Sequence, residues 1–231
     1  DAAAVRGLDG TMHGPIPAAD RNGVIGGALA FDGAAQHWVQ VDGGGGLDGA
    51  TEGAISLWVR WEGAQRSDCC GTFGAVLARQ GNGLFSDNIV ALDSADPETA
   101  RVVWRQSGGP APPLIVGQRV VGSSWHHVAV TFSAMSSALY LDGALEGSAS
   151  GNPMHQNGSV PLSLGAWVGD GAGYATASLD DVAVWDQPLA ADQIAELAAQ
   201  ARTPLDFGGP ETALYFAGDG RLLNQNELLR T

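Results

Sequence analysis

Lysine is absent from this chain of 231 residues. Its 11 basic residues are all arginine, and 25 Asp and Glu residues bring the formal net charge to −14. Proteins that bind nucleic acid or an anionic membrane need clustered Lys or Arg, so neither partner is expected. The surplus carboxylates supply oxygen ligands for a hard cation such as calcium, and a solvated acidic surface explains the same composition equally well.

Long apolar runs and spaced cysteines are missing as well. No run approaches the roughly 20 apolar residues of a membrane-spanning helix, which argues against membrane insertion. The only cysteines, Cys69 and Cys70, are adjacent and cannot form a framework of distant disulfides. A disulfide between these two neighbours, a bond to another subunit and two thiols all stay open. No CxxC or CxxH spacing exists, so a cysteine-based zinc site is not expected.

Common catalytic signatures are also lacking. The chain contains no HExxH, GxSxG or GxxxxGK pattern. These patterns mark zinc proteases, serine hydrolases and phosphate-binding loops, respectively. We therefore expect a protein that is not an enzyme.

Short apolar runs are what the sequence does contain, separated by clusters drawn mainly from its 34 glycines and from Asp, Asn and Ser. This pattern predicts an all-β fold. In residues 54–61, Ile55, Leu57, Val59 and Trp61 alternate with Ser56, Trp58 and Arg60, as in an inner strand of a sandwich. A hairpin is expected from strands at 125–132 and 138–141. Further strands are expected at 28–31, 38–41, 75–78, 88–92, 101–104, 114–116, 162–165 and 178–185.

A single helix is predicted at residues 190–201, where an apolar stripe follows Pro188 and Leu189. Pro204 and the Gly-Gly-Pro run at 208–210 then end regular structure. The predicted domain therefore spans residues 1–202, and residues 203–231 form a linker and a strand-forming arm.

Five ordered blocks carry a resemblance to a known family. They are GALAFDG at 27–33, ISLWVR at 55–60, SWHHVAVTF at 124–132, LYLDG at 139–143 and LDDVAVW at 179–185. Together they resemble the laminin-G-like jelly rolls of the concanavalin-A-like lectin/glucanase superfamily over about residues 10–202. The resemblance implies a two-sheet antiparallel β-sandwich, an extracellular or cell-surface location, frequent calcium, and roles in sugar binding or adhesion.

The order of one block departs from that family. There, an apolar-Tyr-Phe strand and an acidic Gly-rich loop precede the segment that residues 7–14 resemble. Here the matching sequence ALYFAGDG stands near the other end, at 213–220. The chain is thus similar to a circularly permuted domain, or to one repeat cut from a tandem array.

The displaced strand carries Leu214, Tyr215 and Phe216 and has two possible places. It can complete the sheet of its own domain, or it can complete the sheet of an identical subunit by strand donation. Donation from subunit to subunit is head-to-tail, and such a contact makes a filament when it does not close into a ring.

Calcium is the cofactor that the resemblance implies. In the family, a structural ion often ties a loop near the first strand to the first Asp of the LDDV block, here Asp180. Asp1 stands where the family tends to place an acidic loop residue, and Asp32 lies in a tight turn. Turn chemistry for Asp32 and structural hydrogen bonding for Asp180 are the alternatives.

Sugar binding has a weaker signal, in Trp61, Trp104 and Trp167, the tryptophans nearest predicted loops or edges. Packing in the core is the favoured alternative for all three. Enzymes of the superfamily carry a Glu-x-Asp-x-x-Glu strand, which this sequence lacks.

These observations lead to two hypotheses of function. The first is a non-enzymatic extracellular structural subunit that assembles head-to-tail into a filament by strand donation. The alternative is a monomeric, calcium-dependent carbohydrate-binding or adhesion module. The sequence begins with Asp1 and not Met, as expected either of a secreted chain whose signal peptide has been removed or of a segment cut from a longer protein.

Overall fold

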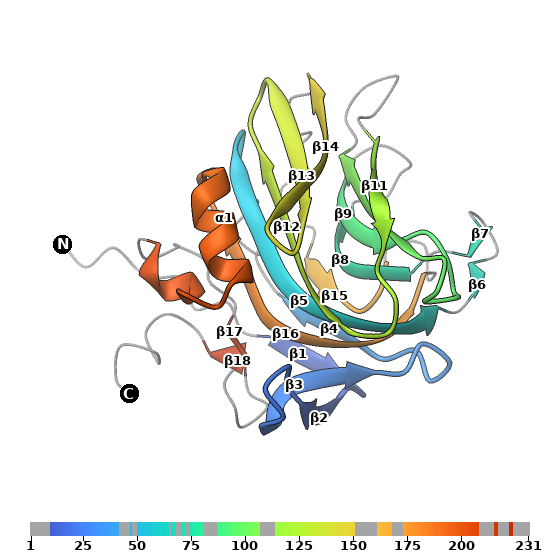
Figure 1. Ribbon diagram of the computed structural model, residues 1–231. Helices are drawn as coiled ribbons and strands as arrows, with labels where there is room; N and C mark the ends of the chain where they lie inside the picture. The colour runs from blue at the N-terminus through green and yellow to red at the C-terminus, as the bar shows by residue number, and fades with distance from the viewer. Residues whose placement is uncertain are drawn as a thin grey trace.

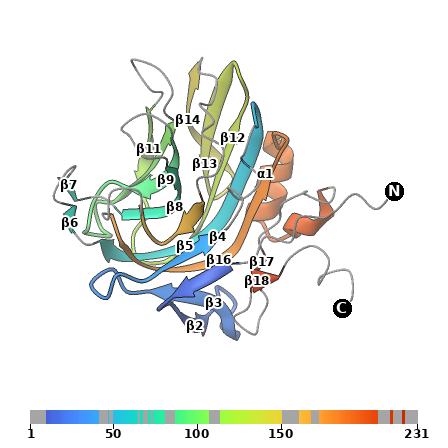
Figure 2. The same cartoon turned by 180° about the vertical axis from the view of Figure 1, so that it is seen from behind.

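Two antiparallel sheets of seven strands each pack face to face in the computed structural model (Figures 1 and 2). The structure describes residues 10–41, 47, 50–64, 66–67, 71–72, 74–80, 87–106, 114–150, 161–167, 173–207, 215–216 and 222–223. This architecture confirms the all-β sandwich that the alternating pattern predicted.

Sheet A has the first strand of the chain at one edge and a strand from the middle of the chain at the other. In spatial order its strands are β1 (Gly10–His13), β4 (Trp38–Val41), β15 (Leu162–Leu164), β8 (Gly74–Gln80), β9 (Asp87–Leu92), β10 (Arg101–Gln106) and β11 (Leu114–Val120). Some neighbouring strands, such as β4 and β15, are far apart in the sequence, so this sheet depends on long-range strand pairing.

Sheet B contains the predicted hairpin and the longest strands. In spatial order its strands are β14 (Ala144–Ser150), β13 (Ser136–Leu141), β12 (Trp125–Phe132), β5 (Gly53–Ala64), β16 (Ala175–Trp185), β3 (Ile25–Phe31) and β2 (Ile16–Ala19). Two small two-stranded ladders are not hydrogen-bonded to either sheet. They pair β6 (Arg66–Ser67) with β7 (Gly71–Thr72), and β17 (Tyr215–Phe216) with β18 (Leu222–Leu223).

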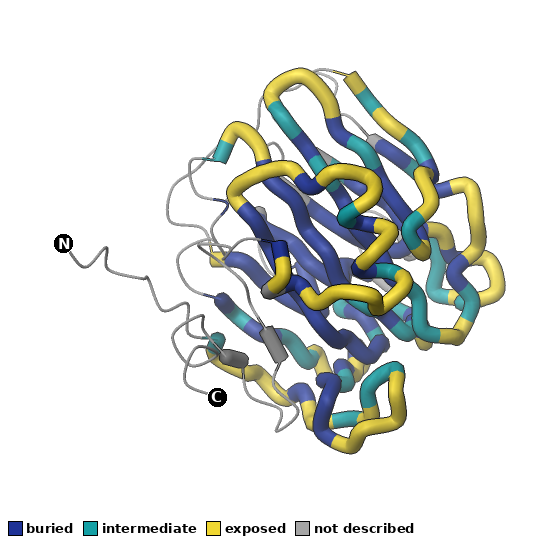
Figure 3. Tube along the Cα trace, turned by 60° about the vertical axis from the view of Figure 1, so that its left-hand side comes forward, coloured by how far each residue is buried: buried dark blue, intermediate teal, exposed yellow. Residues whose placement is uncertain are grey.

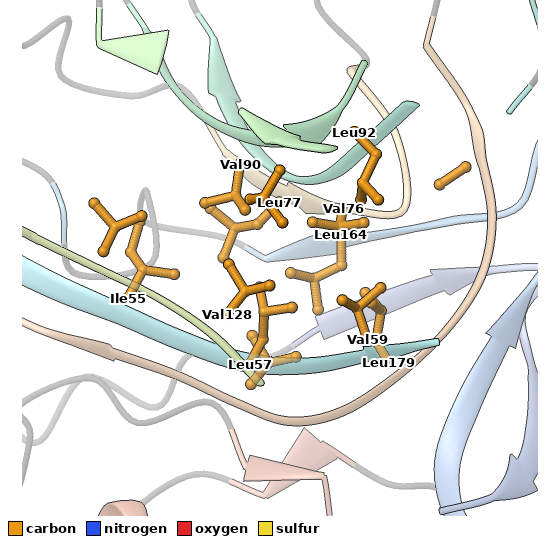
Figure 4. Packing of buried hydrophobic residues seen from close by; sticks show 14 of the residues in the cluster. Ile55, Leu57, Val59, Val76, Leu77, Val90, Leu92, Val128, Leu164 and Leu179 are labelled. Carbon is orange, nitrogen blue, oxygen red and sulfur yellow. The ribbon is translucent and has the colours of Figure 1, made fainter. Parts of the chain in front are cut away.

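The core lies between the sheets and is built by period-two alternation. Ile55, Leu57, Val59 and Trp61 of β5 all point into it and are at most 1% exposed, as the sequence predicted. Side chains of both sheets interdigitate there (Figure 4). The strands are buried through the centre, while many of the turns that join them are exposed (Figure 3).

Strand β16 breaks the alternation with a β-bulge. Its core residues Leu179 and Val182 are three positions apart, because the register shifts between Asp180 and Ala183. The extra residue, Asp181, has a φ of 45°, a left-handed conformation that Asp tolerates better than most residues. Two adjacent carboxylates therefore stand on the side of sheet B that faces away from the core.

Helix α1 (Ala191–Ala198) covers one half of that outer face (Figure 1). The Gln193 side chain accepts a hydrogen bond from the backbone N–H of Ala190 at 2.8 Å, which stabilises the first turn. Ile194 and Leu197 pack on Trp185 of β16, and Phe207, after the short helix η3 (Pro204–Asp206), joins them. The predicted helix is confirmed, and it ends three residues earlier than expected.

The ladder of β17 and β18 lies close to β16 (Figures 1 and 2). Strand β3 pairs with β16 only at Ala177–Leu179, whereas β5 pairs with β16 along its whole length. Strand β17 contacts β16, but its pairing partner is β18. Among the described residues, Tyr215 and Phe216 are thus not hydrogen-bonded into either seven-stranded sheet, and completion of their own domain's sheet stays a prediction. Insertion of this strand into a neighbouring subunit stays a prediction, as does the domain boundary at residue 202.

One pair of sheet edges is tied together. The buried Glu146 carboxylate on β14 accepts hydrogen bonds from the backbone N–H groups of Gln118 at 2.6 Å and Arg119 at 2.9 Å on β11. These bonds and the pairing with the Arg119 guanidinium lower the pKa of Glu146 against the effect of burial. The opposite edges, β1 and β2, have no such tie among the described residues.

Candidate functional site

The outer face of sheet B carries polar and aromatic side chains beside the half that α1 covers. Strand register places them in two rows across β12, β5 and β16, and Ser56, Asp181 and Arg21 adjoin these rows. We call these nine residues the outer-face patch. They are Trp125, Arg60 and Ser178 in one row, His127, Trp58 and Asp180 in the other, and Ser56, Asp181 and Arg21 beside them.

Arg21 stands at the centre of the charges in this patch. It comes from the turn between β2 and β3, bonds the Asp180 carboxylate through Nη1, and approaches Asp181 Oδ2 at 2.6 Å through Nη2. Burial and the neighbouring Asp181 raise the pKa of Asp180 to about 6, although Arg21 opposes the shift. The pKa of Arg21 is itself raised, because the two carboxylates outweigh its burial. Two carboxylates share one guanidinium, so one negative charge is in excess.

Two tryptophans of the patch are partly exposed and lie under guanidinium groups. The Arg21 Cζ atom is 4.9 Å from the Trp58 ring centroid. The Arg60 Cζ atom is 5.6 Å from the ring centroid of Trp125, its cross-strand neighbour. Such cation–π contacts hold both rings in place on a rigid sheet.

His127 lies beneath Trp58 and is fully buried. Its Nε2 atom is 2.8 Å from Ser56 Oγ, and its Nδ1 atom has no hydrogen-bond partner. Burial lowers the pKa of His127 to about 4, so the imidazole is neutral at pH 7. A neutral ring offers one donor and one acceptor.

A cavity of about 10 Å³ adjoins these groups. On sheet B it is lined by Ser56, Trp58, His127 and Asp181. Arg21 from the turn between β2 and β3, Leu197 from α1, and Arg202 and Pro204 from the segment after α1 complete the lining. This volume holds about one water-sized group. The arrangement can thus bind a small polar group with donors, acceptors and an aromatic ring within reach.

A family model described as the concanavalin A-like lectin/glucanases superfamily, laminin-G type, matches residues 32–195. The chain belongs to this superfamily. The match confirms the family resemblance and contains four of the five sequence blocks in full, and it leaves circular permutation as a prediction. No curated protein sequence matches the chain.

Solved structures show the same fold at low sequence identity. The binding domain of Paraclostridial Mosquitocidal Protein 1 is 15% identical with a TM-score of 0.64; the match covers 84% of this chain and 48% of that one. The present chain thus spans about half the length of the toxin domain. Domain 4 of AbnA, an extracellular arabinanase from Geobacillus stearothermophilus, was solved with arabinotriose. It is 16% identical with a TM-score of 0.54, over 82% of this chain and 87% of that one. A heptameric SAP-like pentraxin from Limulus polyphemus is 15% identical with a TM-score of 0.51, over 85% and 84% of the two chains.

The donor atoms at Asp180 do not fit the calcium site that the family implies. Its carboxylate is occupied by the guanidinium of Arg21, whose positive charge repels a cation. Asp32 Oδ1 instead accepts backbone hydrogen bonds from Ala34 at 2.8 Å and Ala35 at 3.3 Å, as turn chemistry suggested. In the part of the chain that the structure describes, no group of three His, Cys, Asp or Glu could hold a metal. Asp1 lies outside the described residues.

The three tryptophans considered for sugar binding are packed in the interior, and that expectation is corrected. Trp61, Trp104 and Trp167 are at most 2% exposed, so their rings present no face to a sugar. The Trp61 Nε1 atom donates to the Ser94 carbonyl at 3.0 Å. Gly74 is required beside Trp61, because a Cβ there would lie 2.2 Å from its Cη2 atom. The core alternative is the one that the structure shows.

Two further predicted sites fall where little is described. Cys69, Cys70 and Leu214 lie outside the described residues. For Tyr215 and Phe216 only the strand pairing is known. Their proposed disulfide and assembly roles stay predictions.

Of the outer-face patch, the sequence pointed only to Asp180. Trp58 and Trp125 lie within the blocks at 55–60 and 124–132, which carry the family resemblance and not a predicted site, and Arg21 lies 159 positions from Asp180. The outward position of Trp58 was visible from the alternation of β5. The pairing with Arg21 had no local signal.

Proposed function

We propose that this domain is a non-enzymatic carbohydrate-binding module of a secreted or cell-surface protein, and that the outer-face patch is its binding surface. One observation carries the proposal: partly exposed Trp58 and Trp125 lie beside guanidinium, carboxylate and hydroxyl groups on a rigid sheet. A sugar ring has an apolar face of C–H groups and a rim of hydroxyls. Aromatic rings pack on the first, and polar groups bond the second.

Structural neighbours support this class of function. The arabinanase domain was solved in complex with arabinotriose, and its match to this chain spans most of both domains. Another neighbour comes from botulinum neurotoxin type C, whose cell entry depends on interaction with two ganglioside molecules. Both neighbours are below 25% identity, so they support a common fold, and the sugar itself is left to experiment. The described helices include none long and apolar enough to cross a membrane.

A glycan array probed with the labelled protein tests the proposal. We expect the wild type to bind a defined set of glycans, and Trp58→Ala and Trp125→Ala each to weaken binding about tenfold. Trp38→Ala is the matched control. Trp38 is also partly exposed, but it lies on β4 of sheet A and stacks on His13 with 4.2 Å between ring centroids. Absence of any glycan signal, or equal losses from all three variants, would contradict the proposal.

Self-assembly by strand donation is the second candidate, and the open edges of the sandwich favour it. β1 and β2 are edge strands of sheets A and B. Met12, Ile16 and Ile25, on or beside them, are 49%, 61% and 86% exposed. Edge strands with exposed apolar side chains are templates for pairing with another chain.

Sizing and electron microscopy of the intact chain test assembly. If residues 213–217 complete a neighbour's sheet, the protein forms head-to-tail filaments, and deletion of residues 211–231 leaves a monomer that is prone to aggregation. A synthetic peptide with Leu214, Tyr215 and Phe216 then caps the deletion variant. A stable monomer at high concentration would exclude strand donation and leave the carbohydrate-binding module.

A further inference from the structure

Two buried polar atoms beside the cavity have no partner. They are Nδ1 of His127, whose side chain is fully buried, and Nε of Arg21. More than nine in ten buried polar groups in proteins are hydrogen-bonded, so two unpaired ones at one cavity need an explanation. Both residues line the cavity, together with Ser56, which bonds the other nitrogen of the imidazole. The pair points to a polar group that binds there.

The charges around the cavity select the kind of group. An anion is disfavoured, because both guanidinium groups that line the cavity are already paired with carboxylates, Arg21 with Asp180 and Asp181 and Arg202 with Glu196. A cation is disfavoured by the same two guanidinium groups and gains nothing from a neutral His127. A hydroxyl group both donates and accepts, which matches the Asp181 carboxylate, the imidazole and the Arg21 Nε–H. The cavity is thus suited to a neutral alcohol.

The size of the cavity selects the part of the ligand. A volume of about 10 Å³ admits one hydroxyl-sized group and no ring. Residues Leu197, Arg202 and Pro204 wall it toward the C-terminal segment. A glycan chain cannot run through such a cavity, whereas a group at the end of a chain can enter it.

We infer that the cavity receives a hydroxyl group at the end of a neutral glycan, and that the partly exposed Trp58, which lines the cavity, contacts the ring that carries this group. The inference rests on the carbohydrate-binding function proposed above and adds that the module recognises chain ends. His127 and Ser56 position the hydroxyl group, which donates a hydrogen bond to the Asp181 carboxylate.

Calorimetric titration with a chain-length series tests the inference. The probes are neutral oligosaccharides, from disaccharide to octasaccharide, of the type that gives the strongest array signal. If the cavity recognises chain ends, each oligosaccharide binds one protein molecule at every length, and the affinity stops rising after the first few sugar residues. If it recognises chain interiors, the number of protein molecules bound per oligosaccharide rises with chain length.

Variants link the binding to the cavity. We expect His127→Gln and Ser56→Ala each to lower the affinity about tenfold, since the first removes a buried hydrogen bond to the ligand and the second removes the Ser56–His127 bond that orients the imidazole. His126→Gln is the matched control, because His126 is the neighbouring histidine of β12, bonds Asp142 at 2.9 Å and does not line the cavity. Circular dichroism checks that each variant folds. If His127→Gln does not fold, Ser56→Ala alone tests the inference.

The outcomes separate the two proposals. If no neutral glycan binds, the proposed function and this inference both fail. If glycans bind but stoichiometry rises with length, or if the cavity variants bind like the wild type, the module stands and chain-end recognition is overturned. A constant stoichiometry together with weakened binding by both cavity variants supports the inference.

Discussion

The outer face of sheet B has two halves built from the same three strands, β12, β5 and β16. In one half, Trp185, Ala54 and Ala129 form an apolar surface that α1 covers. In the other half, the same strands present Trp58, His127 and Asp180, and a single arginine from a distant turn lies over them. Side-chain chemistry thus decides where the sandwich is closed and where polar groups are left near solvent. We expect the two halves to respond differently to substitution.

The apolar half should contribute most to stability. Trp185 is fully buried against Leu189 and Ile194, so Trp185→Ala should lower the free energy of unfolding by about 3–5 kcal/mol. Trp125→Ala in the polar half, where the ring is partly exposed, should lower it by about 1 kcal/mol or less. Urea unfolding measures both. Equal losses would mean that the two halves are equivalent in packing.

The polar half should depend on charge balance. Arg21→Gln leaves two buried carboxylates without a cation and should lower the free energy of unfolding by about 3 kcal/mol. Asp180→Asn removes the excess negative charge and keeps the Arg21–Asp181 pair, so it should cost less than about 1 kcal/mol. A larger loss from Asp180→Asn than from Arg21→Gln would refute this view of the cluster.

Acid should act on this half in two opposite ways. The pKa of His127 is about 4 in the folded protein against an ordinary 6.5. The unfolded chain therefore binds more protons between these values, and stability falls as pH drops from 6.5 to 4. The pKa of Asp180 is about 6 against an ordinary 3.8. Here the folded protein binds more protons, and stability rises as pH drops from 6 to 3.8.

Because the two contributions oppose each other, each should be visible only when the other is removed. Each amounts to about 3 kcal/mol at most. Relative to the wild type, we expect His127→Gln to gain stability between pH 6.5 and 4 and Asp180→Asn to lose it. Melting temperatures across this pH range measure both. Parallel curves for the three proteins would show that neither group has a shifted pKa.

Calcium should have the smallest effect on the wild type. The family resemblance implies an ion at Asp180, which EGTA would remove with a fall in melting temperature. The Arg21 ion pairs predict little change instead. In Arg21→Gln, Asp180 and Asp181 become available to a cation, so calcium should raise the melting temperature of this variant by mass action. A clear effect of EGTA on the wild type would support the calcium site predicted from the sequence.

The sequence predicted best those strands whose apolar and polar residues alternate regularly. β4 and β12 have the bounds expected from alternation, and β5 has the expected inward face. β14, with the sequence ALEGSAS, was missed because it has little apolar alternation and is held by pairing with β13 and by Glu146. β2 was missed because it contains Pro17, which only an edge strand accommodates.

The candidate site was less predictable than the fold. Period two places Asp181 inside the sandwich, and the β-bulge turns it outward because Leu179 and Val182 must both reach the core. Trp61, Trp104 and Trp167 stood near predicted loops, yet sheet packing buries them. Neither outcome has a signal within a few residues along the chain.

The amino-acid sequence alone determined the fold class, the superfamily and most strands of this protein, because alternation and turn residues act over short distances. Only the tertiary structure decided which carboxylates meet Arg21, which tryptophans remain partly exposed and where a polar cavity forms. These features arise from contacts between residues such as Arg21 and Asp180, 159 positions apart. Long-range pairing of strands brings such residues together, and no local pattern encodes it.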